Sequence, residues 1–404
     1  MNFKFLSRSF PLCDYYFCVP KLCLGSMGFW PGDTCRQNAA NIGARINFFI
    51  LAIGVVTEIH AGCSVLKSDL ELALDTLCPA GTSAVTLLKM GLIYYYRKDL
   101  AWVLKRMQVL VYERGGELRI NPTKKHIIRA HSVVAARLNF IPFVMGFITC
   151  TSYNLKPLLI TLILYLQDQE LMWKLPFNMT MPAFLLHAPY YPLTYIFTAY
   201  TGYITIFMYS GCDAFYFEFC SNTAALLKLL QEDLKSIVGY GGDKLSLTAE
   251  ELTMLEWRLV RFIKRHNDII ELTRYFRKRY TVITLAHFVS AGLVIGASIF
   301  DLMTFTGFGI VIYIGYTIAV LGQLFIYCYG GSMVSENSVA LATVAFGCDW
   351  YACNPKLRRY ILMIIIRSQR AISMSVPFFS PSLVTFTSVL QTSGSIIALV
   401  SSFK

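Results

Sequence analysis

The sequence predicts an all-α integral membrane protein with seven transmembrane helices. Of its 404 residues, 55 % are hydrophobic and 15 % are charged, and the mean hydropathy is +0.53. This composition is more apolar than that of an average soluble domain. Seven apolar stretches are each long enough to cross a bilayer as a helix. Lysine and arginine collect in alternate links between these stretches, which is typical of a multi-pass membrane protein.

The predicted spans are separated by links that differ in length and charge. The spans are residues 42–59, 78–96, 132–153, 189–212, 280–300, 307–330 and 375–403. The long fourth link has amphipathic periodicity, so we expect its helices to extend below the membrane as an anchor region. A basic helix precedes the last span. We therefore divide the chain into residues 1–212 (with the outer-half pocket of spans one to four), 213–279 (cytosolic helical extension), 280–354 (spans five and six) and 355–404 (basic helix and last span).

The distribution of basic residues predicts the orientation of the chain. Of the 36 lysines and arginines, 29 lie in segments on the side of the N-terminus, four lie on the other side, and three lie inside spans. The positive-inside rule then predicts a cytosolic N-terminus and an extracellular C-terminus. The single Asn-x-Ser/Thr sequence, at Asn178, falls outside under this assignment. It is either a glycosylation site or an unused chance match.

The sequence argues against catalytic and metal-dependent functions. The twelve cysteines do not have the spacing of a metal site. No Gly-x-Ser-x-Gly or His-Glu-x-x-His motif occurs, and no span carries paired carboxylates. The net charge of +12 is explained by the cytosolic links rather than by a nucleic-acid surface. We predict no enzymatic activity, no cofactor, no metal and no nucleic-acid partner.

The last span carries hydroxyl side chains along one face, which includes Ser388, Thr392, Ser395 and Ser402 and is interrupted by Leu399. Such a face is poorly suited to lipid. One interpretation is that these small residues pack against neighbouring helices. The other is that they line water, with Leu399 as an apolar constriction.

From the sixth span onward the sequence resembles the insect odorant receptor family. The resemblance is carried by Gln-Leu-Phe-Ile-Tyr-Cys-Tyr-Gly at residues 323–330, Ser-Glu-Asn at 335–337 and Asp-Trp-Tyr at 349–351. It continues with Arg-Ser-Gln-Arg at 367–370, Phe386, and Thr-Ser-Gly-Ser at 392–395. The length, the number of spans, the orientation and the long fourth link also fit. The family's usual aromatic residue between the last two serines is Gly394 here.

The resemblance implies a subunit of a ligand-gated, non-selective cation channel in the plasma membrane of an olfactory neuron dendrite. It implies four subunits around one pore, each contributing its last helix. The chain lacks the long insertion that marks the family's shared co-receptor, so it resembles a tuned, odorant-specific subunit that assembles with that co-receptor. By the same resemblance the gate falls on Leu399, Ser402 and Phe403, which supports a pore-lining role for the hydroxyl face.

The family's odorant pocket lies in the outer half of the membrane, among the second, third, fourth and sixth spans. The residues that fit by type and depth are Val85, Thr86, Phe140, Phe143, Phe147, Tyr195, Ala199, Tyr203, Tyr316 and Val320. Ordinary helix packing is the alternative for each of them. An apolar, aromatic pocket suits a small volatile with few polar atoms. His287 would offer such a ligand a polar contact, or would bond to a neighbouring helix.

Three other classes of membrane protein are alternatives. A gustatory-type channel of identical subunits is the nearest, but its terminal Thr-Tyr-x5-Gln-Phe pattern is matched only loosely by Thr385, Phe386 and Gln391. A G-protein-coupled receptor predicts an external N-terminus, contrary to the charge distribution. A transporter would normally show internal repeats, and we find none.

Overall fold

We describe the fold from a computed structural model of the 404-residue chain. The description covers residues 12–32, 37–68, 70–112, 122–168, 174–238, 249–304 and 309–402. Within these ranges the regular structure is helical, apart from an isolated extended bridge between Val376 and Phe379. The all-α architecture predicted from the sequence is therefore confirmed for the described residues.

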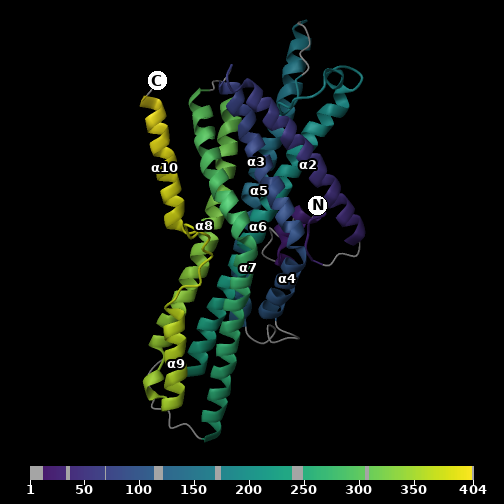
Figure 1. Ribbon diagram of the computed structural model, residues 1–404. Helices are drawn as coiled ribbons and strands as arrows, with labels where there is room; N and C mark the ends of the chain where they lie inside the picture. The colour runs from purple at the N-terminus through teal and green to yellow at the C-terminus, as the bar shows by residue number, and fades with distance from the viewer. Residues whose placement is uncertain are drawn as a thin grey trace.

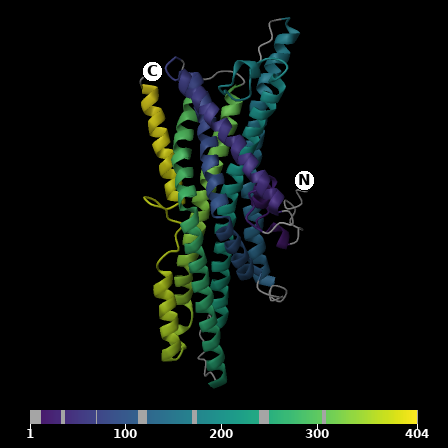
Figure 2. The same ribbon diagram turned by 45° about the vertical axis from the view of Figure 1, so that its right-hand side comes forward.

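Long helices run side by side along the molecule (Figures 1 and 2). Each predicted span overlaps one of them: α2 (Gln37–Val65), α3 (Leu70–Tyr95), α5 (Pro122–Leu166), α6 (Tyr191–Val238), α7 (Ala249–Thr304), α8 (Gly309–Gly347) and α10 (Leu383–Ser402). Of these, α2, α3, α5, α7 and α8 contain an apolar window long enough to cross a membrane. The shorter helices are α1 (Cys18–Ser26), α4 (Arg97–Tyr112) and α9 (Pro355–Ser368).

The long fourth link continues the helices on either side of it. Helix α6 has 48 residues and α7 has 56, so each runs well beyond its predicted span. With α8 and α9 they form the narrow lower part of the molecule (Figure 1). Ion pairs join these helices to their neighbours, including Lys124 to Asp233 at 2.8 Å and Lys356 to Glu256 at 2.5 Å. Because these pairs are partly exposed, each contributes only about 0–1 kcal/mol.

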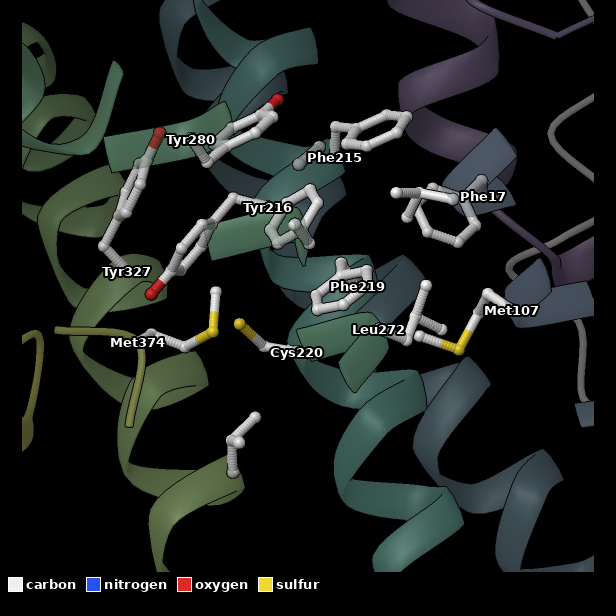
Figure 3. Packing of buried hydrophobic residues seen from close by; sticks show 14 of the residues in the cluster. Phe17, Met107, Phe215, Tyr216, Phe219, Cys220, Leu272, Tyr280, Tyr327 and Met374 are labelled. Carbon is white, nitrogen blue, oxygen red and sulfur yellow. The ribbon is translucent and has the colours of Figure 1, made fainter. Parts of the chain in front are cut away.

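Helix α6 forms the centre of the core, and its residues 207–227 are all buried. Figure 3 shows aromatic rings of α6 facing Tyr280 of α7 and Tyr327 of α8. The ring centroids of Phe219 and Phe276 are 3.8 Å apart, and those of Tyr216 and Tyr327 are 4.3 Å apart. Aromatic pairs of this kind contribute about 0.5–1.5 kcal/mol beyond the burial of their surface. They join α6, α7 and α8 in one packed unit.

The last span begins later than the sequence predicts. We expected it from residue 375, but α10 starts at Leu383. Pro377 and Pro381 lie in the intervening segment, and proline lacks the N–H that a helix interior requires. The segment crosses α8 closely at Gly331, where a Cβ atom would collide with the carbonyl oxygen of Pro381. The Leu383 N–H then donates to Ser332 Oγ at 3.0 Å, which fixes the start of α10 on α8.

A candidate ligand cavity, a buried charge cluster and the last helix

A cavity of about 70 Å³, here called the inner cavity, lies among α3, α5, α6 and α8. Its wall is mostly apolar and built largely from small side chains. The lining residues are Pro79, Thr82 and Ser83 of α3; Gly146, Thr149, Cys150 and Tyr153 of α5; Phe177 of the loop between α5 and α6; Gly202, Thr205, Ile206 and Tyr209 of α6; and Tyr316, Ala319, Val320 and Gln323 of α8. Spaces between the helices of a bundle are typical binding sites for small apolar ligands.

The hydroxyl groups of this wall already have partners. The hydroxyls of Thr82 and Tyr316 lie 2.6 Å apart, and those of Ser83 and Thr205 lie 3.2 Å apart. Thr149 Oγ1 donates to the carbonyl oxygen of Met145. A ligand can therefore rest against the wall without leaving a buried polar group unsatisfied, and shape and dispersion would dominate its binding.

Two of the ten residues predicted for the pocket, Tyr316 and Val320, line the inner cavity. Thr86 is fully buried one turn from Thr82 and donates to its carbonyl oxygen at 2.7 Å. The other predicted residues lie outside the cavity wall: Val85, Phe140, Phe143, Phe147, Tyr195, Ala199 and Tyr203.

Several of the predicted residues that lie outside the cavity wall pack on other aromatic side chains. The ring centroids of Phe147 and Tyr203 are 5.5 Å apart, and those of Phe143 and Phe207 are 5.2 Å apart. The Tyr195 hydroxyl donates to the carbonyl oxygen of Asn154. Helix packing, the alternative considered for each, describes their contacts here.

The sequence reasoning missed most of the lining because it favoured large aromatic side chains. The cavity exists where side chains are small. Two glycines show this, because a Cβ at Gly146 would lie 3.3 Å from Ile206 and a Cβ at Gly202 would lie 2.7 Å from the Phe177 ring. A sequence feature that could have predicted the lining is the presence of small or weakly polar residues one helical turn apart, such as Gly146 and Cys150.

A cluster of buried polar groups adjoins the inner cavity. Lys89 Nζ lies 2.5 Å from Asp213 Oδ1, and the Tyr327 hydroxyl donates to the same oxygen at 2.9 Å. His287 Nδ1 lies 3.2 Å from Lys89 Nζ and 3.1 Å from the hydroxyl of Tyr209. All five side chains are 4 % exposed or less. Charges buried at this depth are tolerated only when they are paired, so the cluster joins α3, α6, α7 and α8 tightly.

Tyr209 belongs to both the inner cavity and the charge cluster. Its ring lies under Lys89, with Nζ 3.6 Å from the ring centroid. Beyond it, the rings of His287 and Tyr327 stack at 4.3 Å, and Phe288 contacts Tyr327. Phe288 in turn lies 4.5 Å from Phe379, in the segment before α10. A continuous set of packed side chains therefore links the wall of the cavity to the start of the last helix.

Helix α10 leaves its hydroxyl face uncovered in the single chain. Ser388, Thr392 and Ser395 are exposed, and the last two donate to the carbonyls of Ser388 and Gln391 at 2.9 Å. On the opposite face, Ser393 is buried and Phe386 packs on Phe325. The side chains of Leu399 and Ser402 and the whole of Phe403 lie outside the described residues.

Asn178 lies on the loop between α5 and α6. Its side chain is exposed, and Nδ2 donates to Thr76 Oγ1 of α3 at 3.0 Å.

These features describe a helical membrane protein with a cavity among its helices, joined by a series of side-chain contacts to a last helix that has an uncovered hydroxyl face. The chain belongs to the odorant receptor family: the family described as 7tm Odorant receptor matches residues 69–394. It is 52 % identical to Odorant receptor 10a of Drosophila melanogaster, over 99 % of both chains. Family members are ligand-gated channels rather than enzymes.

Two further similarities bear on the fold and on partners. The fold is similar to the insect olfactory receptor OR5 from Machilis hrabei in complex with eugenol, with a TM-score of 0.79 and 15 % identity over 97 % of this chain and 100 % of that one. The odorant receptor coreceptor of Aedes aegypti is 25 % identical over 158 residues, which cover 38 % of this chain and 32 % of the coreceptor.

Proposed function

We propose that this chain is a tuned odorant receptor subunit that binds a small volatile molecule in the inner cavity and gates a non-selective cation channel together with a co-receptor. The observation that carries the proposal is the inner cavity itself, with its weakly polar wall and its contact, through Tyr209, to the cluster that leads to α10. The eugenol bound to the related OR5 supports a ligand of this size and polarity.

The proposed mechanism follows the contacts outward from the cavity. A ligand that presses on Tyr209 moves the ring that lies under Lys89. The displacement passes from the cluster to the stacked ring of Tyr327, then to Phe288 and Phe379, and so to the start of α10. The ligand opens the channel only to the extent that it binds the open arrangement more tightly than the closed one.

The uncovered face of α10 supplies the pore in this proposal. Ser388, Thr392 and Ser395 face the conduction path, and Leu399, Ser402 and Phe403 form its gate. Four subunits, some of them co-receptors, surround the pore. The N-terminus is cytosolic, in a neuronal plasma membrane, and Asn178 is on the outer side, where it can be glycosylated.

The decisive experiment is whole-cell recording from cells that express this chain with and without the co-receptor, during application of a panel of volatiles. We expect odorant-evoked cation current only from the pair. Current from this chain alone would instead identify a self-sufficient channel of identical subunits. If both proteins are at the cell surface and no volatile evokes current in either condition, the proposal fails.

A further inference from the structure

A second cavity, here called the outer chamber, adjoins the inner cavity at the end of the bundle where α2 meets α3. Its volume is about 210 Å³, and its walls come from α2, α3, α5 and the loop before α6. Residues 174–178 of that loop form one wall. The loop is fixed in place, because the Thr180 N–H donates to the Thr57 carbonyl and Thr180 Oγ1 lies 2.9 Å from His60 Nδ1.

The outer chamber and the inner cavity share a partition of Pro79, Tyr153 and Phe177, which line both. The rings of Tyr153 and Phe177 are stacked, with centroids 5.7 Å apart and planes 20° apart. Phe177 also rests against the bare backbone of Gly202. Two aromatic side chains and a proline ring therefore separate the two spaces.

The outer chamber differs from the inner cavity in its chemistry. Glu58 lines it and is only 3 % exposed, and no hydrogen bond or ion pair of its carboxylate occurs among the described residues. A buried carboxyl group without a partner leaves its hydrogen-bonding capacity unused, so a ligand or water that reaches it gains a hydrogen bond. Asp75, Lys156 and Lys174 are the other charged residues of the wall. A neutral polar molecule can bond to the Glu58 carboxyl group and still enter the apolar inner cavity, whereas an ion would first have to lose its hydration.

We propose that the outer chamber is a second binding site. A small neutral molecule with an apolar body and one hydrogen-bond donor binds there through Glu58, and then passes the Tyr153–Phe177 partition into the inner cavity. This inference rests on the proposed function for its ligand, and on the proposed orientation for the side from which the ligand arrives. In this proposal, a ligand is selected first for its polar group at Glu58 and then for the fit of its apolar body in the inner cavity.

Cys150, a native buried thiol in the wall of the inner cavity, permits a test that needs no channel activity. The probe is benzyl methanethiosulfonate, applied to intact cells. The Cys150 thiolate attacks the probe's sulfenyl sulfur, a disulfide forms and methanesulfinate leaves. Mass spectrometry of the peptide that contains Cys150 then reports arrival in the inner cavity. The exposed Cys63 is replaced by serine throughout.

The outer chamber is blocked after folding, so that misfolding does not confuse the result. In Lys174→Cys, a bulky, membrane-impermeant maleimide is attached at the rim of the chamber. We expect it to slow labelling of Cys150 at least tenfold. In the matched control Ala183→Cys, an exposed position on the same loop outside the chamber wall, the same maleimide leaves the rate unchanged. Equal labelling in the two blocked proteins, or no labelling of Cys150 in the unblocked protein, would overturn the proposal.

A second arm tests Glu58 itself. A 4-hydroxybenzyl probe should label Cys150 several times faster than the benzyl probe in the parent protein. In Glu58→Leu the two rates should become equal, and this substitution is compatible with folding because it replaces a buried polar group, without a partner among the described residues, with an apolar group of similar size. Persistence of the hydroxyl advantage in this variant would refute the role of Glu58. Because labelling is independent of current, failure here is distinguishable from failure of the channel proposal.

Discussion

Lys89 and Asp213 form an ion pair of 2.5 Å between α3 and α6, and both side chains are almost completely inaccessible to solvent. The pair lies beside the inner cavity. Lys89 contacts the ring of Tyr209 and Asp213 accepts a hydrogen bond from Tyr327, so the pair is part of the series of contacts from the cavity to α10.

Removal of one partner of this pair should destabilise the protein severely. Lys89→Met leaves the Asp213 carboxylate buried without its cation, which typically costs about 3–5 kcal/mol. We expect a lower melting temperature and a large loss of surface expression. The double variant Lys89→Met with Asp213→Leu should recover most of that loss, since it leaves no unpaired charge. If the double variant is as unstable as the single one, the pair is not the cause.

Tyr209→Phe should weaken gating more than binding. The substitution keeps the ring under Lys89 but removes the hydroxyl that bonds to His287. A hydrogen bond contributes about 1 kcal/mol, so we expect a shift of roughly fivefold in the gating equilibrium, measured as a reduced maximal current. Tyr203→Phe is the matched control, because its hydroxyl bonds to Thr151 away from the cluster. Equal effects of the two substitutions would argue against transmission through Tyr209.

Gly202→Ala should narrow the inner cavity. The new Cβ would lie 2.7 Å from the Phe177 ring and 3.0 Å from Cys150 Sγ, so both side chains must shift into the space. We expect the half-maximal concentration of an activating odorant to rise about fivefold or more, with the largest ligands affected most. Gly81→Ala, on α3 beside Thr82, has open space at its Cβ and should leave the dose–response curve unchanged. A normal curve for Gly202→Ala would place the ligand elsewhere.

Cysteines at two neighbouring positions of α10 should differ in their response to a thiol reagent. In Thr392→Cys the new thiol lies on the exposed face, whereas in Ser393→Cys it is buried against the bundle. If the exposed face lines the pore, a charged methanethiosulfonate reagent should change the current of an open channel containing Thr392→Cys, and it should leave Ser393→Cys unaffected. The reverse pattern would mean that the hydroxyl face does not meet the conduction path.

The helices could be predicted from sequence because their signal is strong and local. Apolar runs of membrane length mark α2, α3, α5 and α8 directly, and the basic links mark their boundaries. The start of α10 was predicted eight residues early, because hydropathy does not register the two prolines that keep residues 375–382 out of the helix. Hydropathy reflects the free energy of transferring a side chain out of water, whereas the ends of a helix depend on its backbone hydrogen bonds.

The inner cavity was harder to predict, because a cavity depends on which side chains fail to fill space across four helices. Tyr316 and Val320 fitted by depth, but Thr82, Ser83 and Gly202 carry no local signal that distinguishes a lining residue from ordinary packing. Asp213 was missed for a related reason. It directly follows the fourth predicted span, so the sequence assigns it to the polar link. In the structure α6 continues through this position, and the Asp213 side chain is buried.

The residues that line the inner cavity should tolerate mutation during evolution better than the buried ion pair beside it. A lining residue such as Ser83 or Ala319 can be exchanged for another small residue without stranding a charge, so the volume of the cavity can drift in single steps. Lys89 and Asp213 have no such freedom, since loss of either leaves the other buried without its ion-pair partner. If the inner cavity binds the odorant and these contacts carry its effect to α10, as we propose, receptors with this architecture can change the odorants they bind while those contacts are inherited unchanged.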